Sequence, residues 1–475
     1  MSPKKSPRHG ALKAVLILVM VLLLAASGFM IKLCLDLAEA PVETQPKTQS
    51  GVQLPASPTE PSIPETTQPV PEHVVSTATI GSMGDLLMHM TIFDAQKYNA
   101  AVQQKDGSYD FESVFRYLTP YTSALDYTAI NLETTLCGTD NGYAYSGYPL
   151  FNCPDAIVDG ALDAGFDMML TANNHSYDTG LVGYKRTLEV IRETGLETLG
   201  TYLSPEETRW SIVDVNGIRI GMLCYTYATG VTSDGRPSLN HNVAISEAGI
   251  CNYFYADALD SFYGEVTEYL DQMEQAGAEA TMIFLHWGNE YELTQRQTQT
   301  DMAQRLCDLG VDVIVGGHPH VVQPMDLLES TLDPDHKTVC LYSMGNAVSN
   351  QRLGNLDAIT TAHTEDGVLF TVTFEKYSDG TVYLAGTDIL PTWVNMHNND
   401  SGRTEYNILP LDPDQEDQWS TMFDISEDTV ASARNSLSRT MAIVGDGLEE
   451  CQLWLAGQKQ QREQYYYDLA YGNAS

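Results

Sequence analysis

The chain has 475 residues, of which 63 are acidic and 25 are basic, so its formal net charge at pH 7 is −38. A surface this acidic argues against nucleic acid as a partner, because phosphate binding needs a basic surface. The charge is usual for an exported protein and does not by itself identify a ligand. The length allows one large α/β domain with additional segments, or more than one typical domain.

The N-terminal residues predict a membrane anchor. Four basic side chains within residues 1–13 precede an apolar run of 18 residues, Ala14 to Ile31. Eighteen residues lie near the lower limit for a helix that spans a bilayer, and the basic flank predicts that residues 1–13 stay in the cytoplasm. We therefore expect a single-pass signal anchor over residues 14–33 in the cell membrane, with the globular part extracellular. The alternative is a cleaved signal peptide, because the run contains Ala25-Ala26-Ser27.

A proline-rich linker is expected over residues 34–76. Residues 41–76 include eight prolines and no aromatic side chain. A segment of this composition cannot bury enough apolar surface to fold, and its prolines keep it extended. We expect it to be a disordered stalk between the membrane and the folded part.

Strand and helix patterns alternate through the expected globular domain, residues 77–411. Apolar runs of strand length are Val74–Ile80, Tyr127–Leu132, Phe166–Leu170, Ile218–Tyr225, Ala280–Leu285, Val311–Val315 and Val339–Tyr342. Helical spacing of apolar residues occurs in Leu181–Glu193, Ala258–Gln275 and Arg296–Leu309. Such alternation predicts right-handed crossovers and a largely parallel central sheet.

The pattern changes after this α/β part. Gly367–Lys376 and Thr381–Ile389 flank the turn Tyr377-Ser378-Asp379-Gly380, which predicts an antiparallel hairpin. Residues 412–475 are acidic and helical in pattern, and we expect them to form a peripheral C-terminal appendage. The fold class predicted from these patterns is a layered α/β structure that ends in antiparallel strands.

The cysteines do not define a disulfide framework. Cys137 and Cys153 flank a loop rich in glycine and tyrosine and are candidates for a pair. Cys224, Cys307 and Cys340 lie in apolar runs, where a buried free thiol is expected.

Metal-ligand side chains follow several of the predicted strands. They occur in the segments GSMGD (81–85), AINLET (129–134), TANNH (171–175), FLHWGNEY (284–291) and VGGHPH (315–320). Ligand groups gather at the carboxyl ends of parallel strands, so these side chains are expected to meet. A set of Asp, Glu, Asn and His favours Mn, Fe or Zn over Ca, and a carboxylate can bridge two such ions. The sequence therefore predicts a site for one or two divalent cations.

Each of these residues also has a purely structural interpretation. Asp85 could cap a helix, Asn131 or Asn173 could stabilise turns, and His286 could be a core histidine with satisfied hydrogen bonds. His318 and His320 differ, because two imidazoles flanking a proline in a glycine-rich loop have few structural uses. It is the joint placement of the set that favours a metal site.

With these motifs the chain resembles the CapA family of capsule and poly-γ-glutamate biosynthesis proteins, whose fold is similar to calcineurin-like metallophosphatases. The resemblance covers roughly residues 77–350 and continues through residues 391–402. It is carried by NLE (131–133), ANNHSYDTG (172–180), HWGNEY (286–291), GHPHV (317–321) and YSMGN (342–346). It implies a metallophosphatase-like layered β-sandwich flanked by helices.

The resemblance also implies a role for each matching residue. Asp85 and His320 would bind the first metal, Asn174, His286 and His318 the second, and Glu133 would take the bridging position. His175 would act as the acid that protonates the leaving group, and Asp178 would orient it. Asn346 would line the same cleft.

Two positions depart from the metallophosphatase pattern. Leu87 stands where that superfamily has a histidine two residues after the first aspartate, and His89 is the nearest substitute. Glu133 replaces the bridging aspartate in a different local motif. These departures put the first metal site, and with it the usual two-metal catalysis, in question.

The expectation for function is a membrane-anchored, extracytoplasmic protein in the synthesis or export of an anionic, poly-γ-glutamate-like polymer. Its metal cleft would bind an anionic polymer or phosphate-like substrate and could hydrolyse it, and its anchor, residues 14–31, could contact membrane synthetase subunits. One alternative is a secreted metal-dependent phosphoesterase unrelated to capsule. Another is a non-catalytic scaffold with a structural metal.

Overall fold

The computed structural model describes residues 70–97, 109–241, 243–355, 357–399 and 402–472. They belong to one compact unit, Gln68–Ser475. The expected anchor, 14–33, and most of the expected linker, 34–76, lie outside the described residues. In the part of the chain that is described, no helix is both long enough and apolar enough to cross a membrane. The first strand begins at Val74, three residues before the expected start of the domain.

The first sheet combines parallel and antiparallel strands. Its order is β18 (Thr404–Pro410), β17 (Val382–Asn398), β16 (Asp366–Tyr377), β1 (Val74–Leu86), β2 (Tyr127–Leu132), β3 (Met168–Leu170) and β4 (Glu197–Leu199). Strands β1 to β4 are mutually parallel, and β16 to β18 are antiparallel to their neighbours. A short strand, β15 (Asn346–Val348), pairs in parallel with the end of β1. The hairpin predicted from the sequence is confirmed as β16 and β17.

The second sheet is mainly parallel. Its order is β10 (Tyr253–Phe254), β6 (Ile218–Tyr227), β11 (Ala280–His286), β12 (Val313–Gly317), β14 (Lys337–Leu341) and β13 (Met325–Glu329). Strand β5 (Ser211–Val215) pairs antiparallel with β6, and β13 pairs antiparallel with β14. A small third sheet contains β7 (Gly230–Val231), β8 (Pro237–Leu239) and β9 (Val243–Ala244).

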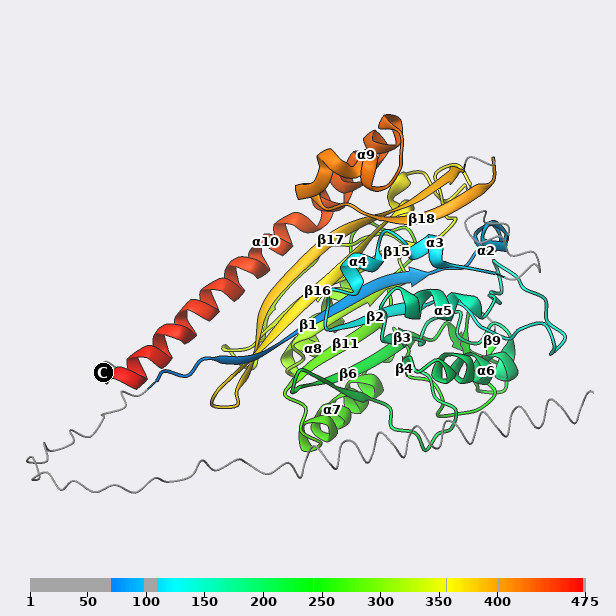
Figure 1. The fold of residues 1–475 in the computed structure, drawn as a ribbon. Helices are drawn as coiled ribbons and strands as arrows, with labels where there is room; N and C mark the ends of the chain where they lie inside the picture. Colours follow the sequence, from blue (N-terminus) through cyan, green and yellow to red (C-terminus); the bar gives the residue numbers. More distant parts are fainter. Residues whose placement is uncertain (1–69, 98–108, 242, 356, 400–401, 473–475) are drawn as a thin grey trace, which may run out of the picture. The chain divides into compact units, whose positions relative to one another are not determined.

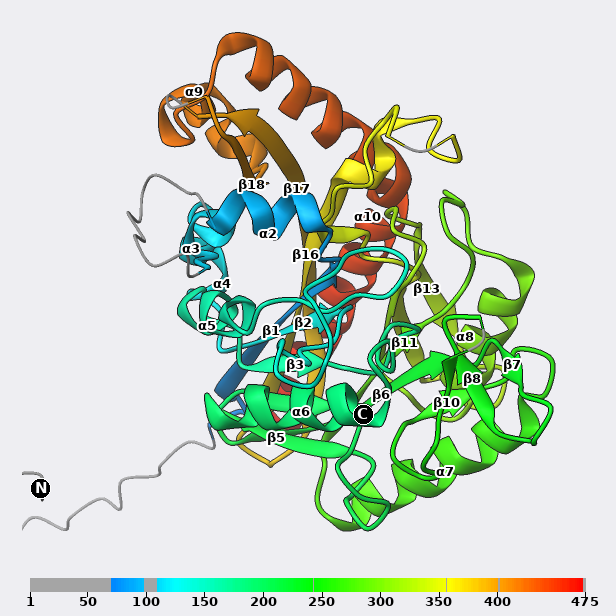
Figure 2. The same ribbon diagram turned by 90° about the vertical axis from the view of Figure 1, so that its right-hand side faces the viewer.

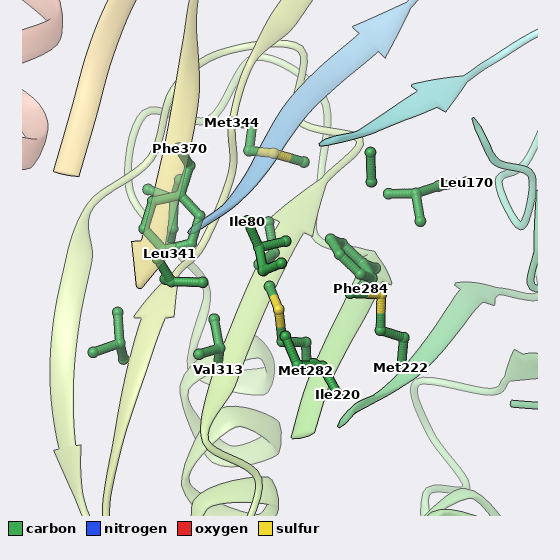
Figure 3. Close-up of a cluster of buried hydrophobic side chains, with 14 of the residues drawn as sticks. Ile80, Leu170, Ile220, Met222, Met282, Phe284, Val313, Leu341, Met344 and Phe370 are labelled. Carbon is green, nitrogen blue, oxygen red and sulfur yellow. The ribbon is translucent and has the colours of Figure 1, made fainter. Parts of the chain in front are cut away.

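The two large sheets pack face to face. Figure 3 shows Ile80 and Phe370 of the first sheet against Ile220, Met282 and Val313 of the second, within one buried apolar cluster. The expectation of one central, largely parallel sheet is therefore corrected. Strand and helix alternation predicts parallel neighbours, but it carries no information about which sheet a strand joins. The sandwich implied by the family resemblance agrees with this arrangement.

Helices cover the outer faces of the sandwich. A second apolar cluster packs the first sheet against α2 (Met90–Lys97), α3 (Glu112–Phe115) and α5 (Ala156–Asp163). A third packs the second sheet against α7 (Asp260–Gln275) and α8 (Gln297–Asp308). Figure 2 shows these two groups of helices on opposite sides. The remaining helices are α4 (Thr119–Thr122), α6 (Gly180–Glu193), α9 (Trp419–Met422), α10 (Glu427–Tyr471) and two 3-10 turns, Ala362–Glu365 and Pro413–Gln418.

The C-terminal segment is helical as expected, but it is not peripheral. The 45-residue helix α10 runs alongside β17 (Figure 1). Its residues Val444, Leu448 and Cys451 belong to the apolar cluster between the two sheets. Its Arg439 pairs with the buried carboxylate of Asp366 at the start of β16. The helix therefore completes the sandwich core.

Cys137 and Cys153, which the sequence left as candidates for a pair, are both buried free thiols. The loop between them is held by an amide side chain instead. Asn152 donates hydrogen bonds to the carbonyl oxygens of Gly138 and Ala144 and accepts one from the backbone of Cys137. The three other cysteines discussed above are buried free thiols, as expected.

Candidate metal centre

The carboxyl ends of strands from both sheets meet at one edge of the sandwich. Asp85 is the penultimate residue of β1 and lies in register with Asn131 of β2. In the second sheet, His286 ends β11 in register with Gly317 at the end of β12. Each strand is buried where it approaches this edge, so the buried run fixes the position of the ligand side chain. The structure thus brings together the ligands predicted from five separate segments.

One group of potential ligands contains Asp85, Glu133 and His320, with one donor atom from each lying within 4.8 Å of the others. His320 Nδ1 is 3.0 Å from Asp85 Oδ2, and its Nε2 is 3.9 Å from Glu133 Oε1. All three side chains are buried. These are the residues that the family resemblance assigned to the first metal and the bridge.

A second group contains Glu133, His286 and His318 under the same distance limit. His286 Nε2 lies 3.4 Å from Glu133 Oε1 and 2.7 Å from Asn174 Oδ1. The rings of His286 and His318 are 4.8 Å apart. Asn174 therefore belongs with the second group, as the resemblance implied.

The loop that carries His318 and His320 adopts an unusual backbone. Both residues have positive φ, 95° and 55°, in a region that side chains other than glycine seldom occupy. Such strain persists only where the surrounding structure enforces it, and it is common at functional sites. Here it turns two imidazoles, separated by one proline, toward the same carboxylate.

Glu133 gives the clearest indication that metal belongs here. Its carboxylate is fully buried, and neither oxygen accepts a hydrogen bond from the described residues, although His286 approaches one of them. His318 Nδ1 is also buried without a partner. An unpaired buried charge is costly, and buried charges in proteins are normally paired or coordinate metals. The residues present therefore fit a two-ion centre with Glu133 shared by both ions.

Two asparagines orient the first ligand. Asn131 Nδ2 donates to Asp85 Oδ1 at 2.7 Å, and Asn173 Nδ2 donates to Asn131 Oδ1 at 3.1 Å. Asn173 also accepts a hydrogen bond from the backbone of His175, so it stabilises a turn as well. Outer partners of this kind fix the direction of a metal-binding carboxylate. The structural interpretation is thus confirmed for Asn173, which stabilises a turn and also supports the site, whereas Asn131 bonds to the side chains of Asp85 and Asn173.

Charge interactions tune the imidazoles in the metal-free protein. Burial lowers the pKa of His320, but Glu133 and Asp85 outweigh it and raise that pKa to about 9. Burial raises the pKa of Asp85, and the neighbouring histidines reverse this and lower it. Burial and the adjacent imidazoles hold the pKa of His318 well below its usual value.

His175 and Asp178 form a buried pair beside the two ligand groups. His175 Nδ1 lies 2.7 Å from Asp178 Oδ2, and that oxygen also accepts the backbone N–H of Phe151. Burial lowers the pKa of His175, but the charge and hydrogen bond of Asp178 raise it overall. The carboxylate accepts the Nδ1–H and favours the imidazolium form, whose second proton lies on Nε2. This geometry suits a protonated imidazole that donates to a leaving group.

Asn240 is a residue of the site that the sequence did not reveal. It lies between β8 and β9, and its Nδ2 donates to Asp178 Oδ1 at 2.8 Å and to the carbonyl oxygen of Pro149 at 2.9 Å. Its φ of 41° places it in the left-handed region, where asparagine is enriched. The preference of asparagine for a left-handed backbone was the only local feature of the sequence that could have pointed to Asn240.

Leu87 stands where the metallophosphatase pattern has a histidine, and the structure shows where Leu87 and the nearby His89 lie. Leu87 and His89 line the cleft, but neither belongs to a ligand group. His89 Nδ1 accepts a hydrogen bond from the backbone of Asn350, and burial lowers its pKa to about 4. His89 therefore does not replace the missing histidine as a ligand. Asn346 lies nearer to the first ligand group than His89 does, because its Oδ1 is 3.2 Å from His320 Nδ1.

A cleft of about 650 Å³ opens onto the centre. Its lining includes both His175 and His320 together with Tyr148, Phe151, Glu290, Tyr291, Asn350, Gln351, Asn355 and Asp357. The volume lies in the range of small-molecule sites. Its charged lining residues, apart from histidines, are the acidic Glu290 and Asp357, so the side chains alone do not attract an anion.

Comparisons with known proteins find a family match and similar proteins. Residues 79–351 match the family described as "Bacterial capsule synthesis protein PGA_cap". The chain is 25% identical to the capsule biosynthesis protein CapA of Bacillus anthracis, over 60% of this chain and 63% of that protein. It is also 25% identical to the PGA biosynthesis protein CapA of Bacillus subtilis (strain 168), over 71% of this chain and 78% of that protein. The match thus spans less than two thirds of the first relative.

Among solved structures, the chain is similar to one described as "Termus thermophilus Sulfate thiohydrolase SoxB in complex with glycerol". The identity is 14%, the match covers 77% of this chain and 60% of that one, and the TM-score is 0.37. A similarity this low supports no inference about activity.

Proposed function

This chain belongs to the bacterial capsule synthesis protein family PGA_cap, and from that premise we propose that it acts on an anionic capsule polymer through the metal centre. The polymer would be poly-γ-glutamate-like, and the step would belong to its synthesis, release or export. The observation that carries the proposal is the buried, unpartnered carboxylate of Glu133, shared by two ligand groups. A centre of two divalent ions, Mn, Fe or Zn, would stabilise a tetrahedral oxyanion and activate water when bound.

The chain's own residues would supply the rest of the chemistry. Glu133, with the two groups around it, would hold the ions, and the walls of the cleft would exclude water. His175 would donate its proton to the leaving group, and Asp178 would keep the imidazole oriented and protonated until that step. Glu290 and Asp357 would repel an anionic substrate that is not bound to the ions. The substrate would therefore enter only with its anionic group at the metal.

We further propose that the protein is anchored by residues 14–33, with the unit from Gln68 onward outside the cytoplasmic membrane. The basic flank and the apolar run support that orientation. An enzyme that works on exported polymer needs to be held near its site of synthesis. A proline-rich spacer would give it reach.

A phosphoesterase assay with a matched control tests the catalytic part. The full-length chain loaded with Mn is expected to hydrolyse an aryl phosphate, and His175→Ala to lose roughly 10²–10⁴-fold in rate. His336→Ala is the control, because His336 precedes β14 at the opposite edge of the sheet. Equal rates in all three proteins would refute a catalytic role for His175.

A cell-based measurement tests the capsule part. Cells that lack the chain should lose surface polymer, and wild type should restore it while His175→Ala should not. Restoration of surface polymer by His175→Ala would favour the scaffold function. The observation in favour of that function is Leu87, which stands where metallophosphatases have a histidine. Unchanged surface polymer without the chain would favour a phosphoesterase unrelated to capsule.

A further inference from the structure

A cavity separate from the metal cleft lies between β17 and the first turns of α10. Its volume is about 430 Å³, which is within the range of small-molecule sites. The 3-10 turn Ala362–Glu365 and Arg352 complete its walls. Among the described residues, none lines both this cavity and the metal cleft. Whatever this cavity binds is therefore bound independently of the metal centre.

One face of β17 supplies a buried amide to the cavity. Trp393, Asn395 and His397 have the two-residue spacing of a single strand face, and all three line it. Asn395 is only 2% exposed. Its Nδ2 lies 3.3 Å from His397 Nδ1, whereas its Oδ1 accepts no hydrogen bond from the residues that the structure describes. A buried acceptor without a partner is costly, and a molecule in the cavity that donates to it would remove that cost.

The surface of α10 that lines the cavity is also polar. Its lining residues recur every three or four positions, and so lie on one side of the helix: Asp428, Ser432, Asn435 and Arg439. Farther along the helix, Val444 and Leu448 pack into the apolar cluster between the sheets. A helix face that is turned toward the protein is normally apolar. The polar side chains at the start of α10 therefore indicate a polar molecule in the cavity rather than core packing.

The charged groups around the cavity are already neutralised. Arg352 pairs with Glu365 at 2.7 Å, and the two side chains are only 12% and 11% exposed. Arg439 pairs with Asp366, also at 2.7 Å. Neither arginine of the lining is thus a free cation, and the remaining charged group apart from His397 is the carboxylate of Asp428. The cavity therefore does not favour an anionic ligand.

We propose that this cavity binds a neutral saccharide unit. The amides of Asn395 and Asn435 and the hydroxyl of Ser432 can each donate and accept hydrogen bonds, as the hydroxyl groups of a sugar do. Trp393 and Met396 supply the apolar contact that the C–H face of a sugar ring needs. Such a site would hold the protein on a glycan and leave the metal cleft free. The inference goes beyond the proposed function and does not depend on it.

Binding of the full-length chain to immobilised glycans tests the proposal. The probes are neutral oligosaccharides of glucose, galactose and N-acetylglucosamine, with oligosaccharides of uronic acids and of amino sugars for comparison. Wild type should bind a neutral glycan in preference to both charged kinds. Asn435→Ala removes an exposed amide from α10 and should weaken that binding about fivefold. Ser432→Phe places a ring in the cavity from an exposed helix position and should abolish the binding.

Ser438→Phe is the matched control, because Ser438 is an exposed serine of the same helix that does not line the cavity. It should bind the glycan as wild type does. Asn435→Ala only shortens a side chain, so its result stands even if Ser432→Phe does not fold. If both cavity variants bind the glycan as wild type does, the cavity is not the site. If wild type binds no neutral glycan, or binds a uronic-acid glycan more tightly, the saccharide assignment is wrong.

Discussion

Replacing Glu133 by glutamine removes the charge that both ligand groups share and keeps the shape of the side chain. The expected effect is on metal-linked stability. A ligand that binds only the folded state at one hundred times its Kd stabilises it by about 2.7 kcal/mol. Loss of an outer partner of a metal ligand commonly weakens binding 10–100-fold, and loss of a shared ligand should weaken it at least as much. If Glu133→Gln weakens metal binding a hundredfold, the same metal concentration stabilises the variant by only about 0.4 kcal/mol.

The assay is thermal or urea unfolding of the full-length chain with and without Mn at that fixed concentration. Glu290→Gln is the control, because Glu290 lines the cleft and belongs to neither ligand group. Wild type and Glu290→Gln should gain similar stability from Mn, and Glu133→Gln should gain almost none. An undiminished gain in Glu133→Gln would refute the shared-ligand geometry.

Two further predictions concern the dyad and the long helix. Asp178→Asn should lower the pKa of His175, because the charge of Asp178 is what raises it. His175 would then lose its proton at a lower pH. The high-pH limb of the rate profile should therefore move to lower pH. A high-pH limb that does not move would exclude His175 as the acid that Asp178 tunes. Gly447→Ala should cost about 1–3 kcal/mol, because a Cβ there would lie 1.7 Å from the carbonyl oxygen of Met325. Gly457→Ala on the same helix meets nothing within 4 Å and should stabilise by about 0.5–1 kcal/mol; unfolding curves that rank the two in the opposite order would contradict the packing of α10.

The strands and the positions of the candidate metal ligands could be predicted because their signal is local. The strand before His286 is a mostly apolar run that stops at a polar residue, and β1, although it carries Ser and Thr side chains, leads to Asp85 near its end. Asp85 and His286 were found in this way, and both lie at the shared edge. The distribution of strands between two sheets was missed, because pairing between distant strands leaves no trace in either one alone.

The role of α10 was missed for a different reason. Its buried positions recur every three or four residues and include Ser436, Thr440, Val444, Leu448 and Cys451. Two of these five are hydroxyl side chains, which hide the apolar stripe in an acidic segment. Ser436 is buried, and its hydroxyl donates a hydrogen bond to Asp366 at 2.6 Å. The sequence thus predicted a helix but not the surface that it covers.

Asn240 shows the limit of reasoning from motifs. It is far in sequence from Asp178 and reaches it only because the small sheet β7–β9 packs beside α6. Leu239 and Ile245 of that region share an apolar cluster with Tyr184 of α6. Contacts of this kind depend on tertiary packing, which no spacing rule reveals.

The central claim is that two ions bind on either side of Glu133. Crystals of the full-length chain grown with Mn and measured at the Mn absorption edge would test it directly. The account predicts two anomalous peaks about 3.5–4 Å apart, one beside Asp85 and His320 and the other beside His286 and His318. Peaks that lie elsewhere, or an empty site around Glu133 at saturating Mn, would contradict it.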